Sequence, residues 1–281
     1  MAGKQIFELD ALSSFTDTSL LPVHNGTGLK KGLLSQLASY LGNKFSNPNL
    51  LINPDFKINQ RGATSYEQQG YSVDRWKIWN VTVTPNANGG ITVKNDKYTD
   101  TGAFIQILEN AAEGDSTLSC YVTSVTGTVT MLVNDSSKVV LKQGLNVLHT
   151  SNSTKNISIY LNMGTSITLK WVKLEQGKVA TSFIAPNPAE EITKCYRFKY
   201  IGSAILRGRC TANQVFGFTK DLPTALRTKP TMTFKSKNSY NVNTVDLSVK
   251  DGNNAIYLAG TAENTNQTVI EVVLDLDAEI Y

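Results

Sequence analysis

The chain has 281 residues, a net charge of +4 at neutral pH and three cysteines. This length is too great for one ordinary β-sandwich and suits two or three modules. No run of 18 apolar residues occurs, which excludes a membrane-spanning helix. The lysines and arginines are spread over the whole chain, whereas a nucleic-acid-binding protein concentrates them on one element.

The composition favours strands over helices. Thr, Ser, Asn and Val are frequent and Glu is scarce, and this usage suits strands and Asx-type turns. Cys120, Cys195 and Cys210 lack metal-binding spacing and are odd in number, so we expect free, buried thiols. Residues 1–8 lack the apolar core of a signal peptide, so we expect the chain to be made and kept in a cytosol.

Residues 1–46 form a first unit, in which we expect one short strand and one helix. Residues 20–23 are mostly apolar and precede a turn-rich stretch, which predicts the strand. Leucines then recur at every fourth position, which predicts one apolar face of an amphipathic helix: Leu29, Leu33, Leu37 and Leu41. A helix of about 13 residues is not stable alone in water. These leucines must therefore dock on their own chain, on a neighbouring subunit or on a larger particle.

Residues 47–188 form a second unit, a predicted β-sandwich. Residues 50–52 and 56–58 are expected to be two short β-segments joined by a kink at Pro54, which cannot donate to a ladder. Short alternating runs separated by turn clusters then predict nine strands, at 79–84, 91–94, 104–108, 117–123, 128–133, 137–141, 145–148, 157–161 and 167–174. This spacing predicts an antiparallel two-sheet sandwich of the jelly-roll type.

Residues 189–281 form a smaller C-terminal β-domain. Pro188 at a first helical position, with Glu190 and Glu191 behind it, predicts a short helix at the boundary. Six strands follow, at 200–206, 214–219, 231–236, 244–250, 255–259 and 268–276. The predicted fold class is therefore mainly β, a jelly-roll-like sandwich plus a smaller β-domain, with one amphipathic helix in the N-terminal segment.

Five segments of the chain carry a common pattern: residues 49–62, the Asp-Arg-Trp at 74–76, residues 173–183, residues 222–234 and the last six residues. These segments resemble bacteriophage tail-fibre and other virion appendage proteins that carry a carbohydrate-binding-module-like β-sandwich. The resemblance implies a homotrimer in the virion, assembled in the host cytoplasm. It also implies that the first unit contacts capsid or tail and baseplate proteins, and that the C-terminal domain faces the host.

Catalytic patterns are weak. His24 and His149 lie in different modules, and neither is near a nucleophile pattern. A glycan-cleaving fibre would need two carboxylates. The best candidates are three acidic residues that flank the same early strands, Asp55, Glu67 and Asp74. An Asp before Arg-Trp is more often a turn or ladder hydrogen-bonding residue, so we predict no enzyme.

We expect no metal or cofactor. Oxygen-bearing pairs could hold a structural Ca²⁺, namely Asn53 with Asp55, residues 134–136, residues 251–253, and Asp275 with Asp277. None forms a calcium-loop pattern, and an Asx-turn is the simpler explanation for each of them. A structural Ca²⁺ is the open alternative.

The candidate ligand-binding residues flank the first predicted strand. If residues 74–81 are one strand, Trp76 faces the core, while Arg75, Lys77 and Trp79 face the other side. Trp79 could stack on a sugar ring, with Arg75, Lys77 and Tyr71 beside it, or could pack on another subunit. Further arginines are expected to be structural: Arg61 as a buried hydrogen-bonding fork, and Arg197 and Arg227 as ties between modules.

The resemblance thus implies a phage appendage subunit, which we expect to attach to the host surface by many weak glycan contacts. The alternatives are a glycan-cleaving fibre and a decoration protein without a ligand. Besides other virion proteins, the expected partner is a host glycan, with no nucleic acid and no membrane insertion.

Overall fold

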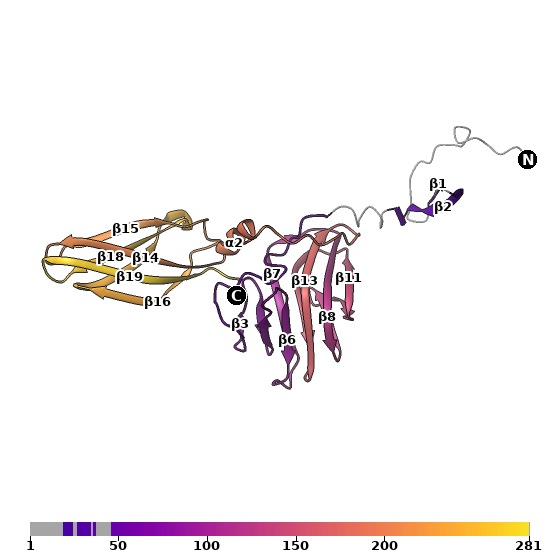
Figure 1. Cartoon of the computed structure of the whole chain (residues 1–281), viewed down its shortest axis with the longest axis horizontal. Coiled ribbons are helices and arrows are strands. Elements are labelled where there is room, and N and C mark those ends of the chain that lie inside the picture. The colour runs from indigo at the N-terminus through magenta and orange to yellow at the C-terminus, as the bar shows by residue number, and fades with distance from the viewer. Residues whose placement is uncertain (1–18, 25–26, 35, 38–45, 281) are drawn as a thin grey trace, which may run out of the picture. The chain divides into compact units, whose positions relative to one another are not determined.

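A computed structural model of the protein describes residues 19–24, 27–34, 36–37 and 46–280 (Figure 1). The chain divides into two compact units. One comprises residues 1–48 and 179–184, and the other comprises residues 49–178 and 185–281.

In the first unit, β1 (Leu20–His24) and β2 (Leu29–Leu33) form an antiparallel hairpin with Leu20 opposite Leu33. The strand expected at residues 20–23 is confirmed. The helix expected from Leu29 is wrong over residues 29–33, which are a strand. A spacing of four residues places side chains on one face of a strand as well as on one face of a helix, and pairing with β1 satisfies the backbone of this segment.

Helical geometry begins only after β2. Leu34, Gln36 and Leu37 are helical, and the Gln36 side chain accepts a hydrogen bond from Leu33 N–H at 2.9 Å. Leu33 and Leu37 are both exposed. Leu41 lies outside the described residues, so the anchoring role of the four leucines stays a prediction.

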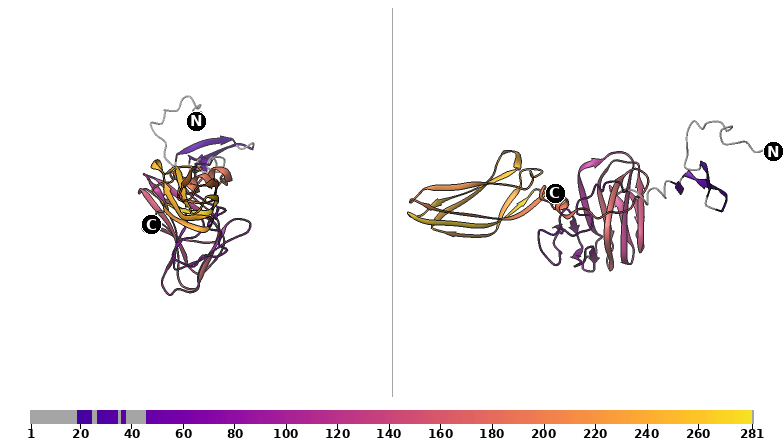
Figure 2. Two further views of the ribbon diagram at one scale, coloured as in Figure 1. Left: turned by 90° about the vertical axis from the view of Figure 1, so that its left-hand side faces the viewer. Right: turned by 45° about the horizontal axis from the view of Figure 1, so that its top comes forward.

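In the second unit, residues 70–176 form a sandwich of two antiparallel sheets (Figure 2). The six-stranded sheet contains, in order, β10 (Ser137–Val140), β9 (Val129–Val133), β12 (Thr154–Leu161), β7 (Gly102–Ala112), β4 (Lys77–Trp79) and β3 (Gly70–Tyr71). The five-stranded sheet contains β11 (Gly144–Thr150), β8 (Ser116–Thr126), β13 (Thr165–Gln176), β6 (Ile91–Asn95) and β5 (Thr82–Pro85).

The chain crosses between these two sheets at most steps. From β6 to β9 each successive strand enters the opposite sheet, and β11, β12 and β13 do the same. This alternation is typical of a jelly roll. The predicted strands from residue 91 onward are confirmed. The strand expected at 79–84 is instead split between β4 and β5, because Asn80 has a left-handed φ of 50° and turns the chain from one sheet to the other.

Aromatic side chains fill the core at one end of this sandwich. Trp76 is 0% exposed and stacks on Phe104, with ring centroids 4.6 Å apart and an interplanar angle of 9°. Phe56 packs against Trp76 at a centroid distance of 5.1 Å. The prediction that Trp76 belongs to the core is therefore confirmed.

The two β-segments expected at 50–52 and 56–58 are wrong, because this stretch contains no strand. The expected kink is present as a turn, in which Phe56 N–H bonds to Asn53 O at 3.2 Å. The stretch is held beside β13 by separate backbone bonds, such as Leu50 N–H to Leu174 O at 2.8 Å. Its apolar residues fill the core from a loop instead of alternating along a ladder.

The C-terminal sandwich begins with helix α2 (Pro188–Tyr196), which confirms the short helix expected there. Asn187 caps it by accepting from Ala189 N–H at 2.9 Å. Two three-stranded sheets follow, β14 (Lys199–Cys210), β19 (Asn266–Asp277) and β16 (Thr231–Tyr240), and β15 (Val215–Asp221), β18 (Ala255–Ala262) and β17 (Val242–Val249). All six predicted strands are confirmed.

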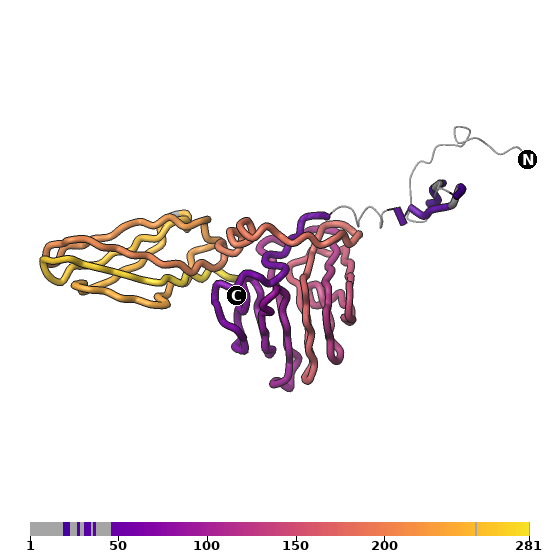
Figure 3. Tube along the Cα trace, in the orientation of Figure 1, coloured from indigo at the N-terminus to yellow at the C-terminus, as the bar shows by residue number. Residues whose placement is uncertain are grey.

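The last strand returns the chain to the start of this sandwich. In Figure 3, β19 (yellow) runs back to the side where α2 lies, and Asp277 at its end is opposite Lys199 at the beginning of β14. A short 3-10 helix, η2 (Asp251–Asn253), precedes β18. Within the described ranges, no helix has the length and apolar character needed to cross a membrane.

Candidate functional site

A groove of about 420 Å³ lies on the outer face of the six-stranded sheet. The groove is defined by the residues that line it: Lys77, Ile78, Trp79, Thr101, Ala103, Ile105, Ile107 and Tyr160. Strand register explains how they meet. Trp79 lies opposite Ala103, and Ala103 lies opposite Tyr160, so these three residues form one row across β4, β7 and β12.

The groove has an apolar floor because β7 carries apolar residues on both faces. Phe104 points into the core, so its neighbours Ala103 and Ile105 point outward. Ala103 is the small residue in the row and leaves a notch between Trp79 and Tyr160. Trp79 remains 51% exposed, which leaves a large aromatic surface available beside that floor.

Close packing beneath the groove holds β7 against the turn that follows β4. A Cβ atom on Gly102 would collide with the Asn80 carbonyl oxygen and a Val81 methyl group. Glycine is therefore required here by the close approach of another backbone. This contact holds Ala103, the next residue on β7, in place beside Trp79 on β4.

Polar groups lie at the Tyr160 side of the groove. The Tyr160 hydroxyl donates a hydrogen bond to Asp135 Oδ1 at 2.6 Å. Burial, together with this bond and the charge of Asp135, raises the pKa of Tyr160 to about 12. The Thr101 hydroxyl donates to Asn162 Oδ1 at 3.3 Å. An apolar floor beside aromatic residues, with a few polar groups at the margin, is the usual composition of a small-ligand site.

Two of the four sequence-predicted ligand residues line the groove, namely Trp79 and Lys77. Arg75 does not, because it has a left-handed φ of 71° and lies before β4. The alternation of faces requires an extended chain, so it could not be applied across this turn. The expectation that Arg75 faces outward beside Trp79 is therefore wrong.

Arg75 is instead buried in contact with the C-terminal sandwich. Its side chain is 1% exposed and pairs with the fully buried Glu279 at 2.5 Å. It also donates to the Ile107 carbonyl at 2.5 Å, and its guanidinium lies 3.6 Å from the centre of the Phe198 ring. The paired charges and the stacked ring make Arg75 a structural residue.

Tyr71 also faces away from the groove. It lies opposite Lys77 on β3, but its hydroxyl donates to the backbone carbonyl of Ile280. The Arg61 guanidinium lies 5.5 Å from its ring centre. Burial, and then the charge of Glu279, raise the pKa of Tyr71 to about 12.

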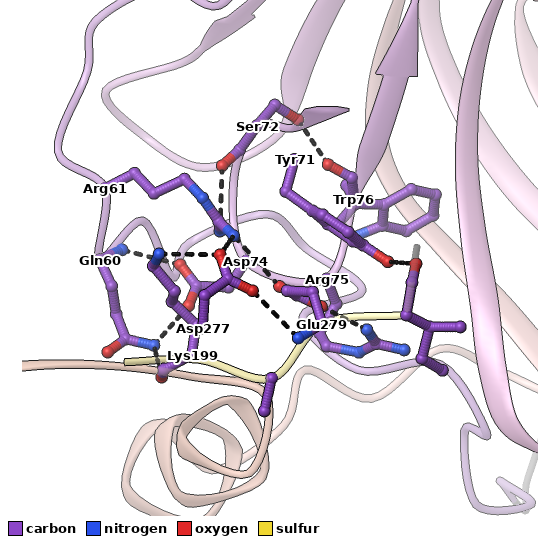
Figure 4. Close-up of polar contacts among 12 residues, drawn as sticks. Gln60, Arg61, Tyr71, Ser72, Asp74, Arg75, Trp76, Lys199, Asp277 and Glu279 are labelled. Atoms are coloured by element: carbon purple, nitrogen blue, oxygen red, sulfur yellow. Dashed lines mark hydrogen bonds and ion pairs between the residues drawn. The ribbon is translucent and has the colours of Figure 1, made fainter. Parts of the chain in front are cut away.

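These contacts belong to a polar cluster that connects the two sandwiches, here called the joint (Figure 4). The joint consists of Gln60, Arg61, Tyr71, Asp74, Arg75, Lys199, Asp277 and Glu279. The Gln60 side-chain amide bonds to Asp74 at 2.5 Å and to the Lys199 carbonyl at 2.7 Å. Arg61 reaches Glu279 at 3.4 Å, and it is largely buried, as expected. Burial raises the pKa of the Glu279 carboxyl, against the opposing charges of Arg75 and Arg61.

The two other arginines also have structural contacts. Arg197 pairs with Glu109 of β7 at 2.6 Å, which ties the C-terminal sandwich to the first one as predicted. Arg227 donates to the backbone carbonyls of Ala278 and Glu279 at 3.1 and 3.3 Å. It therefore holds the C-terminal segment of its own module.

The three acidic residues considered for catalysis have separate partners. Asp74 is buried and accepts from Gln60 N–H at 2.7 Å. Asp55 pairs with Lys57 and Glu67 pairs with Lys97, each at 2.7 Å. Asp74 is thus a hydrogen-bonding residue of the joint.

The oxygen-rich pairs likewise make contacts within the protein. Asp275 and Asp277 bind the Lys199 ammonium at 2.5 and 3.0 Å. Over the part of the chain that the structure describes, no three His, Cys, Asp or Glu side chains gather as metal ligands would. All three cysteines are buried and free, and burial raises the pKa of Cys120 to about 12.

Tyr160, Thr101 and the groove floor were not predicted from the sequence. One signal was present in the sequence, because residues 103–107 are apolar on both faces of a strand apart from Gln106. A strand of this kind on a sheet with one solvated face leaves an exposed apolar surface. The row formed with Tyr160 needed the register of β7 and β12, which no local pattern gives.

No family model matches the sequence, and no curated protein matches it. Among solved structures, two variants of CBM29-2, a family 29 carbohydrate-binding module, align at 14% and 15% identity. Each has a TM-score of 0.30, and the alignments cover 44% of this chain and 100% and 99% of those chains.

A further solved structure aligns over more of the chain. The tandem CBM22-1–CBM22-2 domain of Paenibacillus barcinonensis Xyn10C aligns at 10% identity and a TM-score of 0.28, over 84% of this chain and 91% of that chain. The comparisons thus show distant structural similarity to β-sandwich modules and assign no family.

Proposed function

We propose that this protein is a non-catalytic attachment subunit that binds a glycan in the groove. The observation that carries the proposal is the row of Trp79, Ala103 and Tyr160, with an exposed indole and a phenol on either side of a notch. The C–H face of a pyranose is apolar and flat, so it can pack against aromatic rings while its hydroxyls bond to groups at the margin.

The spacing of the row suits one sugar ring. Trp79 and Tyr160 are two strands apart, which corresponds to roughly 10 Å between their backbones. A flat ring in contact with an aromatic group on each side needs about 7–8 Å, twice the usual carbon–carbon contact distance. Side chains that lean slightly inward across Ala103 would meet this requirement.

We place this binding subunit in a bacteriophage tail fibre or head fibre, as a homotrimer anchored through its N-terminal unit. The support is the resemblance of residues 49–62, 173–183 and 222–234 to such appendages. A small open groove binds weakly, and repetition on a trimer and over many fibres would turn weak contacts into useful avidity. The protein would cleave no glycan bond, since Asp55, Glu67 and Asp74 each bind a different partner.

Glycan binding is tested on an array of bacterial surface glycans, followed by calorimetry of the best ligand. Trp79→Ala should weaken binding by about tenfold or more, since a central aromatic residue carries about 1.4 kcal/mol or more. Ala103→Leu should fill the notch and have a similar effect. Tyr240→Ala is the matched control, because Tyr240 is 61% exposed on β16 and outside the groove. Equal binding by all three variants would refute the groove as the site.

The particle assignment and the lack of catalysis are tested separately. Gold-labelled antibody against the chain should decorate intact phage particles, and sedimentation should give the mass of a trimer. Incubation with the bound glycan should release no reducing ends. Release of reducing ends that is lost in Asp74→Asn or Glu67→Gln would instead indicate a glycan-cleaving fibre.

A further inference from the structure

Asp135 occupies a backbone position that is unfavourable for an aspartate. It follows Asn134 in the turn between β9 and β10, closed by a bond from Ser136 N–H to Val133 O at 3.1 Å. Both residues are left-handed, with φ values of 48° for Asn134 and 58° for Asp135. In hairpin turns with two such residues, the second position is most often glycine.

The Asn134 side chain stabilises the turn through bonds to the neighbouring backbone, whereas the Asp135 side chain does not. The Asn134 side chain donates to Ser153 O at 2.5 Å and accepts from Lys155 N–H at 2.8 Å, which ties the turn to the segment leading into β12. Asp135 is exposed, and its carboxylate accepts a bond from the Tyr160 hydroxyl. The carboxylate therefore serves the Tyr160 side of the groove.

This contact makes that side of the groove an acceptor of hydrogen bonds. The Tyr160 proton is directed at Asp135, and Ser158 bonds to the same phenol oxygen, which leaves one lone pair for a ligand. An ionised carboxylate has about four acceptor sites, and Tyr160 occupies one of them. Ligand hydroxyls can donate to the rest, whereas a ligand carboxylate, phosphate or sulfate would meet a like charge.

We propose that Asp135 makes the groove selective for neutral sugars with free hydroxyls over acidic sugars. The inference rests on the proposed glycan function and adds the ligand class. The inference is based on the 2.6 Å hydrogen bond between Asp135 and Tyr160, which lines the groove. Asp135 makes this bond from a left-handed backbone position that glycine would adopt with less strain. Lys77 lines the same groove, and its positive charge would favour acidic sugars. A preference for acidic sugars is therefore the competing outcome of the test.

The experiment measures selectivity as a ratio. Calorimetry compares neutral gluco-, galacto- and manno-oligosaccharides with the matching uronic-acid oligosaccharides, for the wild type and for Asp135→Asn. Asparagine tolerates the left-handed backbone and still accepts from Tyr160, so the fold is kept. The neutral affinity should fall about fivefold, since bonds to a charged acceptor are stronger, and the uronate affinity should rise. Asp246→Asn, an exposed aspartate on β17, should leave the ratio unchanged.

A second variant separates binding from folding. Asp135→Gly relieves the turn and removes the acceptor, so thermal unfolding should stay the same or occur at a higher temperature while neutral binding falls further. A lower unfolding temperature with unchanged binding would show that the Asp135–Tyr160 bond serves only the fold, and would overturn the inference.

The failure of this inference differs from the failure of the proposed function. Sugar binding that depends on Trp79, with a ratio that Asp135→Asn leaves unchanged or a wild type that prefers uronates, would overturn the role of Asp135 alone. Binding of no sugar from either set would overturn both.

Discussion

The groove and the joint both use side chains from one short stretch, residues 71–79, and differ in almost every physical respect. Arg75 in the joint is buried against a partner charge, whereas Trp79 in the groove is an exposed aromatic residue over an apolar floor. Charged residues that are buried in pairs connect the two sandwiches. A large exposed aromatic side chain with an adjacent notch contributes little to folding, which leaves it available for a ligand.

The largest expected effect is on the buried ion pair of the joint. Arg75→Ala leaves the Glu279 carboxylate buried without its partner, so the free energy of unfolding should fall by about 3–5 kcal/mol. Urea denaturation followed by circular dichroism measures this change. Glycan binding by the folded fraction should remain, because Arg75 does not line the groove.

A matched arginine provides the control for that change. Arg207 pairs with Glu271 at 2.6 Å, but both side chains are exposed, so Arg207→Ala should cost only about 0–1 kcal/mol. Similar losses in the two variants would mean that the joint is not buried as described. Arg75→Met combined with Glu279→Leu should recover much of the loss, since a buried pair can be replaced by apolar residues.

Two tryptophans three positions apart, Trp76 and Trp79, test the same contrast between a buried and an exposed side chain. Trp76→Ala removes a buried ring that stacks on Phe104 and should destabilise the protein by about 3–5 kcal/mol. Trp79→Ala should change stability by less than about 0.5 kcal/mol while reducing glycan affinity. Thermal unfolding measures the stability of the two variants, and calorimetry measures their glycan affinity. A large loss of stability in Trp79→Ala would show that the Trp79 ring serves packing.

Gly102 tests whether the groove depends on close packing beneath it. Gly102→Ala forces a methyl group against Asn80 and Val81 and should cost about 1–3 kcal/mol. Gly208→Ala is the control, because a Cβ there meets nothing closer than 4.0 Å, and alanine should be neutral or slightly stabilising. Unfolding midpoints compare them. Equal midpoints would show that β7 can move away from the turn.

The smallest effect concerns Tyr71 in the joint. Tyr71→Phe loses the bond to Ile280 and should cost about 0.5–1.5 kcal/mol at neutral pH. The pKa of Tyr71 is raised from 10.0 to about 12 in the folded protein, so its contribution is complete below pH 10 and is lost as the pH rises towards 12. Urea midpoints measured between pH 9 and pH 12 should therefore fall more steeply in the wild type than in Tyr71→Phe. Parallel pH profiles would contradict the raised pKa.

The sequence predicted most of the fold because strands are specified locally. Alternating apolar residues bounded by turn residues placed the strands from residue 91 onward, and Pro188 with Glu190 and Glu191 placed α2. The error at residues 29–33 has a clear physical cause. Leu29 and Leu33 fit a helix and a strand equally well, and only pairing with β1 decides between them.

The site was predicted only in part for a related reason. Alternation identified Trp76 as buried and Trp79 as exposed, since both follow from one short run of chain. It misplaced Arg75, because a left-handed residue interrupts the alternation, and it gave no indication of Glu279, 204 positions away.

By itself, then, the sequence determined where the strands from residue 91 onward lie and which of two neighbouring tryptophans is solvent-exposed, because both depend on contacts between residues close in the chain. Only the tertiary structure decided that Ala103 and Tyr160 join Trp79 in one row, and that Arg75 meets Glu279. Sheet register and contact between modules are set by the packing of distant segments, and the free energy that selects them resides in no single stretch of sequence.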